Sequence, residues 1–203
     1  MLEICPYCGN HDWNKEINSE NMKCSKCGYT WEFQSLPLFI LTGCSGIGKT
    51  ATARRLMQNN NDFIVLDADI FYNAMPHQTD DDYQQQIEVL ENLSKDIMQC
   101  GKPLLWTMAG NLDKLKKSYH SRFFSQIYCL ALVCDETSLR SRMTEGRKIT
   151  DDNWIQSSVE YNNFFLTHNA IGELSFETLQ TQDKSIDSVA EDVKKWVLKK
   201  LHP

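Results

Sequence analysis

Residues 38–57 read LFILTGCSGIGKTATARRLM, and this stretch decides the fold. Its first four residues form a short apolar run that suits a central strand of a parallel sheet. The next segment, GCSGIGKT at 43–50, matches the pattern G-x-x-x-x-G-K-[ST], and residues 51–57 are good helix formers. The order therefore predicts a strand, a glycine-rich loop and a helix in direct succession.

The loop has the composition of a phosphate cradle. Glycines let successive backbone amides wrap a β-phosphate, and the start of the helix adds its dipole. Lys49 can reach the β- and γ-phosphates, and Thr50 can hold Mg²⁺. We therefore predict a site for a nucleoside triphosphate, ATP or alternatively GTP, with Mg²⁺. The residues predicted to bind the nucleotide here are Gly43, Cys44, Ser45, Gly46, Ile47, Gly48, Lys49 and Thr50. We assign Cys44 no catalytic role.

A second apolar run, residues 63–66, ends in Asp67-Ala68-Asp69. Carboxylates at the carboxyl end of a strand project into the crevice where α/β proteins bind ligands. The structural alternative is that Asp69 only caps a following helix.

Apolar runs at 103–108, 127–133 and 176–181 predict three more strands, and helical patterns separate them. Alternation of strands and helices after residue 36 predicts a parallel-sheet α/β domain. The strand at 103–108 ends without an aspartate, so the usual Walker B acid is missing there.

The P-loop, followed by a second strand that ends in acidic residues, resembles the P-loop small-molecule and nucleoside kinases, such as shikimate kinase, gluconate kinase and chloramphenicol phosphotransferase. The resemblance implies a five-stranded parallel sheet of order 2-3-1-4-5, and it tolerates small residues in place of the Walker B acid. It also implies that Asp67 is the Mg²⁺-side or general-base carboxylate and that Asp69 binds the acceptor, although these roles could be exchanged.

The run LRSRMTEGRK at 139–148 resembles the segment that leads into the lid of these kinases. By this resemblance, Arg142 lies over the nucleotide base and Arg147 faces the transferring phosphoryl group. A planar guanidinium suits both tasks, because it stacks on bases and binds phosphate oxygens in pairs. The structural alternative is a solvated basic helix face.

Near the N-terminus, two C-x₂-C pairs stand fifteen residues apart, each followed by a glycine, and their members are Cys5, Cys8, Cys24 and Cys27. Four thiolates complete the tetrahedral shell of a structural zinc ion, which a segment of this size needs for stability. Residues 1–34 resemble a zinc ribbon.

Tyr29, Trp31 and Phe33 alternate after the second pair, as in a strand with one aromatic face. They could form a surface for nucleic acid or for a protein partner. Alternatively, they shield the zinc and pack on the main domain, which we favour because so small a module needs its own aromatic residues for a core.

The chain of 203 residues has a net charge of −6, which gives little support to a general nucleic-acid role. It contains no apolar run long enough to cross a bilayer and no signal peptide pattern, so we expect a cytoplasmic protein without a membrane partner. We expect two units, a zinc ribbon at 1–34 and a P-loop kinase domain at 37–203.

These features predict an ATP-dependent kinase whose acceptor is a small molecule, most simply a nucleoside, a nucleotide or a related metabolite. Lys49, Asp67, Asp69 and Arg147 are the predicted catalytic residues. One alternative is a polynucleotide or tRNA kinase that holds RNA on the ribbon. Another is a nucleotide-dependent regulatory or binding module whose ribbon recruits a protein.

Overall fold

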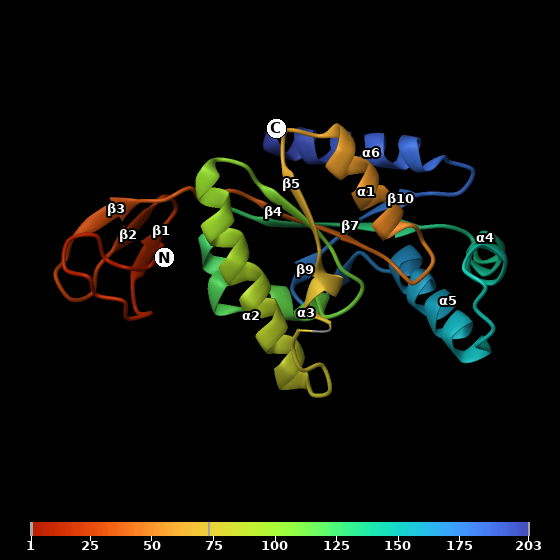
Figure 1. The fold of residues 1–203 in the computed structure, drawn as a ribbon, viewed down its shortest axis with the longest axis horizontal. Helices are drawn as coiled ribbons and strands as arrows, with labels where there is room; N and C mark the ends of the chain where they lie inside the picture. The colour runs from red at the N-terminus through yellow and green to blue at the C-terminus, as the bar shows by residue number, and fades with distance from the viewer. Residues whose placement is uncertain (1, 73, 203) are drawn as a thin grey trace.

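The computed structural model describes residues 2–72 and 74–202, and its larger part is built on one parallel sheet (Figure 1). The five strands of this sheet are β4 (Leu38–Thr42), β5 (Ile64–Asp67), β6 (Leu104–Thr107), β7 (Ile127–Val133) and β10 (Glu177–Gln180). They lie side by side as β5-β6-β4-β7-β10, which is 2-3-1-4-5 when these strands are counted along the chain. The predicted fold class is confirmed.

Helices cover both faces of the sheet (Figure 1). On one face lie α1 (Lys49–Asn59) and α6 (Ile186–Leu201), and on the other lie α2 (Asp80–Ile97) and the short α3 (Leu112–Leu115). The central strand β4 is therefore buried on both sides, which explains its unbroken apolar sequence. None of the helices within residues 2–72 and 74–202 is long and apolar enough to cross a membrane.

The start of α2 explains the run of three aspartates at 80–82. Thr79 caps the helix by accepting a hydrogen bond from the Asp82 amide, and the Asp82 side chain accepts one from the Thr79 amide in return. This capping box satisfies amides that the helix itself leaves without partners. The run is thus an N-terminal cap region.

The remaining elements flank the sheet, and all of them except α5, with 16 residues, are short. Helices α4 (Glu136–Ser141) and α5 (Asp152–Thr167) flank the segment predicted to be a lid, which contains a π-helical turn, η4 (Arg142–Gly146). Single-turn 3₁₀ segments are η1 (Ala68–Phe71), η2 (Met98–Cys100) and η3 (Tyr119–Phe123). A hairpin of two short strands, β8 (Ala170–Ile171) and β9 (Leu174–Ser175), precedes β10. It was not predicted from the sequence.

The N-terminal segment forms a separate antiparallel sheet of β1 (Glu16–Asn18), β2 (Asn21–Lys23) and β3 (Thr30–Glu32). It lies at one end of the molecule, beside α2, and far from α4 and α5 (Figure 1). Phe33 packs edge to face on Phe123 of η3, with ring centroids 5.8 Å apart, and Met22 joins this small core. The predicted packing of the aromatic face on the main domain therefore holds for Phe33.

Tyr29 behaves differently from Phe33. Its ring is 44% exposed and stacks on Tyr7, which is 76% exposed, with centroids 5.6 Å apart. Trp31 continues the stack at 6.4 Å from Tyr29. Part of the aromatic face thus stays at the surface of the ribbon.

A buried ion pair also joins the ribbon to the main domain. Lys95 of α2 places Nζ 3.1 Å from Oε2 of Glu3, and the two side chains are 1% and 10% exposed. The other carboxylate oxygen of Glu3 is buried with no hydrogen-bond partner in the described part of the chain. A buried charge without its partner is costly, so this pair ties the position of the ribbon to that of α2.

Candidate functional site

The phosphate cradle lies where β4 gives way to α1. Gly43 has a φ of 135°, and a Cβ built on it would lie 2.6 Å from the carbonyl oxygen of Leu132 in β7. Gly48, the N-cap of α1, has a φ of 112°. Both positions therefore require glycine, the first for close approach to the neighbouring strand and the second for its left-handed backbone. The backbone amides of such a loop and of the N-terminus of α1 can bind an anion.

Lys49 lies across this loop. Its Nζ donates hydrogen bonds to the carbonyl oxygens of Gly43 and Cys44, at 2.7 and 2.9 Å. Burial lowers the pKa of Lys49, while the carboxylates of Asp69 and Asp67 act in the opposite direction. The ammonium group is thus held beside the cradle by two carbonyl groups, from which it can turn toward a phosphate oxygen.

The thiol of Cys44 is a buried part of the loop. Only 1% of the residue is exposed, and burial raises the pKa of the thiol to about 12. Because the thiolate is the nucleophilic form, this side chain is inert at neutral pH. Thr50, in contrast, is exposed at the start of α1, where its hydroxyl can serve as a metal ligand.

Asp67 and Asp69 occupy different positions at the end of β5. Asp67 is the N-cap of η1, and its Oδ1 accepts a hydrogen bond from the Asp69 amide at 3.2 Å. Asp69 is exposed and borders a cavity described below. Of the two, therefore, Asp67 has the capping role that the sequence analysis weighed for Asp69.

Thr107, at the end of the strand that lacks a Walker B acid, carries a buried hydroxyl group that was not predicted to be part of the site. Thr107 ends β6, in register with Leu41 of β4 and Asp67 of β5. Its Oγ1 is buried and has no hydrogen-bond partner among residues 2–72 and 74–202. A buried hydroxyl without a partner at this edge of the sheet is a polar group that a bound ligand or its water could satisfy.

Arg147, predicted to face the transferring phosphoryl group, lies against the P-loop. Its Nη1 donates a hydrogen bond to Oγ of Ser45 at 2.6 Å, although the two residues are far apart in the sequence. The guanidinium group also lies 5.5 Å from the centre of the Trp154 ring on α5. The ring and the hydroxyl thus hold a cation at the open side of the phosphate cradle.

Arg142 joins the P-loop to the segment after β10. It donates to Oγ1 and to the carbonyl oxygen of Thr181, at 2.8 and 2.7 Å, and to the carbonyl oxygen of Ile47 at 3.3 Å. A cavity of about 260 Å³ is lined by Gly48, Arg142, Thr181 and Lys184, among others. Its position beside the cradle suits a nucleotide base.

A second cavity, of about 240 Å³, opens on the other side of the cradle, between η1, α2 and the segment after β6. Its lining includes Asp69, Phe71, Tyr72, Tyr83, Gln86 and Asn111. We name it the η1–α2 pocket. Of these residues, only Asp69 was predicted from the sequence, because the others come from three separate segments that meet in the folded chain.

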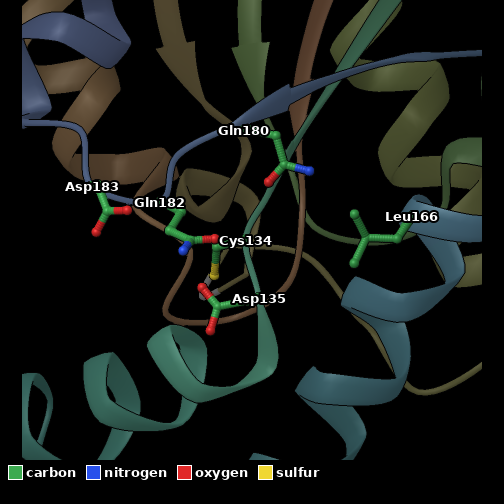
Figure 2. Close-up of a pocket in the computed structure, with 6 residues that line it drawn as sticks. All are labelled: Cys134, Asp135, Leu166, Gln180, Gln182 and Asp183. Carbon is green, nitrogen blue, oxygen red and sulfur yellow. The ribbon is translucent and has the colours of Figure 1, made fainter.

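A larger hollow, of about 440 Å³, lies at the carboxyl ends of β7 and β10 (Figure 2). Its lining contains the carboxylates of Asp135 and Asp183 and the amides of Gln180 and Gln182, with no lysine or arginine from the described part of the chain. Asp135 accepts a hydrogen bond from the Ser138 amide as the cap of α4. Its size notwithstanding, this hollow lacks the cations that a phosphate group requires.

The four N-terminal cysteines converge on one point. Their Sγ atoms all lie within 4.8 Å of one another, with 3.7 Å between Cys5 and Cys27 and 3.8 Å between Cys8 and Cys24. Tetrahedral thiolates at the usual Zn–S distance of about 2.3 Å stand about 3.8 Å apart. Asn10 donates to the Cys24 sulfur at 3.7 Å, as an outer group around a metal does. The cluster therefore fits a four-coordinate metal ion.

Comparisons with known proteins agree with this geometry. A family model described as an AAA domain matches residues 38–153. No curated protein sequence matches the chain. Among solved structures, an unliganded sugar kinase from Janibacter sp. HTCC2649 is similar, with a TM-score of 0.57 and 17% identity, covering 81% of this chain and 95% of that chain.

Two further structures have the same fold. A gluconokinase from Sinorhizobium meliloti 1021 has a TM-score of 0.56 and 14% identity, covering 83% of this chain and 97% of that chain. The shikimate kinase from Acinetobacter baumannii, in complex with shikimate, has a TM-score of 0.51 and 16% identity, covering 84% of this chain and 98% of that chain. Since the family model spans more than half of the 203 residues, the chain belongs to the AAA domain family.

Proposed function

We propose that this protein transfers the γ-phosphoryl group of ATP to a hydroxyl group of a small-molecule acceptor. One observation carries the proposal: the η1–α2 pocket, which Asp69 borders, lies on the opposite side of the phosphate cradle from the cavity at Arg142 and Thr181. A carboxylate between a phosphate cradle and a separate pocket is what transfer to an acceptor requires. Hydrolysis alone needs no second pocket.

In the proposed reaction, the acceptor oxygen forms a bond to the γ-phosphorus while the bond from that phosphorus to the β,γ-bridging oxygen breaks. ADP leaves, and Asp69 accepts the proton of the acceptor hydroxyl, or Asp67 does if the roles are exchanged. Lys49 and Arg147 neutralise the charge on the phosphoryl oxygens. Most of the acceleration comes from positioning and from these charges.

The residues at this edge of the sheet could hold Mg²⁺, which would supply positive charge to offset that of the phosphate groups. Thr50 is the candidate ligand, and Asp67 is the candidate carboxylate on the metal side. Thr107, with its buried hydroxyl, could hold a water molecule next to them. Arg142 and the loop after β10 would bind the base.

For the N-terminal module we propose a structural Zn²⁺ held by Cys5, Cys8, Cys24 and Cys27. The shell is complete with four thiolates, so it has no open position for chemistry. We propose the units 1–34 and 37–203 as ribbon and kinase domain.

A polynucleotide kinase is the second candidate, because the exposed stack of Tyr7 on Tyr29 could hold an unpaired base. The charge of the ribbon speaks against it. Residues 1–34 contain three basic residues, Lys15, Lys23 and Lys26, and five acidic ones, Glu3, Asp12, Glu16, Glu20 and Glu32. A backbone of phosphates favours the opposite balance.

The test is a transfer assay with γ-labelled ATP, Mg²⁺ and separate pools of nucleosides, nucleotides, sugars and short RNAs. Asp69→Asn should lower transfer by about 10²–10⁴-fold, the usual contribution of a positioned general base, with ATP affinity retained. Asp81→Asn is the control, because Asp81 is exposed in the first turn of α2 outside the pocket. Equal transfer by wild type and Asp69→Asn would refute the role of Asp69, and transfer to RNA alone would favour the second candidate.

A further inference from the structure

We infer that the acceptor is an uncharged compound with a flat ring and a hydroxyl-bearing arm, as in a nucleoside, and not a mononucleotide, a sugar phosphate or a carboxylic acid. This inference rests on the proposed function, because it assigns the η1–α2 pocket to the acceptor. It follows from the charge, the walls and the free polar groups of that pocket.

The charge of the pocket excludes an anionic acceptor. Within residues 2–72 and 74–202, Asp69 is the one acidic residue that lines it, and no lysine, arginine or histidine does so. The nearby first turn of α2 adds the carboxylates of Asp81 and Asp82, while that of Asp80 is paired with Lys114. An anion placed here would lose its water without gaining a cation.

The cations that are close to the site have other partners. Lys49 and Arg147 lie at the P-loop, where three phosphate groups require them. Lys114 of α3 is paired with Asp80 at 2.5 Å, and its side chain is only 7% exposed. None of these three side chains lines the pocket, so an acceptor phosphate or carboxylate finds no counter-charge there.

The walls of the pocket favour a flat ring. Phe71, Tyr72 and Tyr83 contribute aromatic surface, and Ile87, Leu90 and Met108 contribute aliphatic surface. Two of the rings contact other aromatic rings: Phe71 is tilted against Trp106 at 5.6 Å, and Tyr72 stacks on His77 at 4.1 Å, both measured between ring centroids. Aromatic rings fixed in this way stack on a flat ligand at a low entropy cost.

Besides the Asp69 carboxylate and the hydroxyl groups of two tyrosines, two side-chain amides line the pocket. Gln86 donates its Nε2 to the carbonyl oxygen of Pro76 at 2.7 Å, which fixes the amide and leaves its oxygen as an acceptor. Asn111 occupies the N-cap of α3 but makes no capping hydrogen bond with its side chain. Carboxamides match the donor and acceptor edge of a nucleobase, and they do so without charge.

The size of the pocket agrees with this ligand. Its volume of about 240 Å³ lies below the ~300–1,000 Å³ of sites that enclose a drug-sized molecule. A ring system can enter between the aromatic walls while the hydroxyl-bearing arm stays at the rim, where Asp69 lies.

The experiment compares matched pairs: each of five nucleosides (adenosine, guanosine, cytidine, uridine and thymidine) and its 5′-monophosphate. Glucose serves as an uncharged compound without a flat ring. Equilibrium binding and transfer from γ-labelled ATP are measured separately on the full-length protein. At least one nucleoside should bind and be phosphorylated with a kcat/KM about tenfold or more above that of its monophosphate and of glucose, because the anion lacks a partner.

The outcomes distinguish this inference from the proposed function. If monophosphates or glucose are phosphorylated as well as nucleosides, the inference is wrong and the kinase reaction stands. If nucleosides bind in the pocket but receive no phosphoryl group, the proposed function is wrong and the assignment of the ligand class stands. If no nucleoside binds, the inference is wrong.

A designed change of preference gives a second test. Gln86→Arg puts a cation into the pocket and should raise the affinity for the monophosphate about tenfold relative to its nucleoside. Gln85→Arg on the exposed side of α2 is the matched control and should leave the preference unchanged. Tyr72→Ala should weaken nucleoside binding while Tyr72→Phe retains it. The same preference in Gln86→Arg and Gln85→Arg would contradict the assignment of this pocket.

Discussion

The ribbon and the P-loop edge both gather reactive side chains, but they arrange them in opposite ways. In the ribbon, the sulfur atoms of four cysteines lie within 4.8 Å of one another, so that they could together supply all four ligands of a metal ion. At the P-loop edge, Lys49, Asp69 and Arg147 come from three separate segments, and Lys49 and Arg147 donate hydrogen bonds to atoms of the loop. The closed arrangement suits a structural ion, whereas the open one leaves room for a substrate to complete it.

Metal removal tests the closed arrangement and should have the largest effect. Cys24→Ser should lose the metal and unfold the ribbon, because structural zinc contributes on the order of 10 kcal/mol of binding free energy to such folds. Metal analysis and limited proteolysis of residues 1–34 measure this. Cys100→Ser, at an exposed cysteine outside the cluster, should keep one zinc ion per chain. A Cys24→Ser protein that keeps its metal and its protease resistance would contradict the account.

The buried ion pair that joins the ribbon to α2 should show the next largest effect. Lys95→Met leaves the carboxylate of Glu3 buried without its cation, which should lower the free energy of unfolding by about 3–5 kcal/mol. Urea denaturation measures the loss. The double variant Glu3→Gln with Lys95→Met removes both charges and should recover part of it. Equal stability of wild type and Lys95→Met would show that this ion pair does not hold the ribbon on α2.

The open arrangement is tested by Lys49→Met. Loss of one charge that acts on the transferring phosphoryl group should reduce kcat by about 10²–10³-fold. Lys26→Met, at an exposed lysine of the ribbon, should leave kcat unchanged and serves as the control. Steady-state kinetics measures both variants. Wild-type kcat in Lys49→Met would remove this residue from the mechanism.

The parts that could be predicted from the sequence depend on local patterns. Glycine and lysine at fixed spacing in residues 43–50 specify the strand, loop and helix, because the geometry of that turn is short-range. Two cysteine pairs with their glycines likewise specify the cluster of four thiols. The sheet order is not local and came only with the resemblance to known kinases.

The walls of the η1–α2 pocket could not be predicted, because they meet only in the folded chain. Phe71 follows β5, Tyr83 is on α2, and Asn111 follows β6. The contacts of Arg142 with Thr181 could not be predicted either, because these residues also meet only in the folded chain. Thr107 was missed because a threonine at a strand end is unremarkable until its hydroxyl is found buried without a partner.

The most direct measurement of the central claim is the stoichiometry of the wild-type reaction with a nucleoside as acceptor. ADP and phosphorylated nucleoside are quantified together with inorganic phosphate as ATP is consumed. The account predicts one phosphorylated acceptor for each ADP, with little inorganic phosphate. ADP that appears with an equal amount of inorganic phosphate, and with no phosphorylated acceptor, would contradict it.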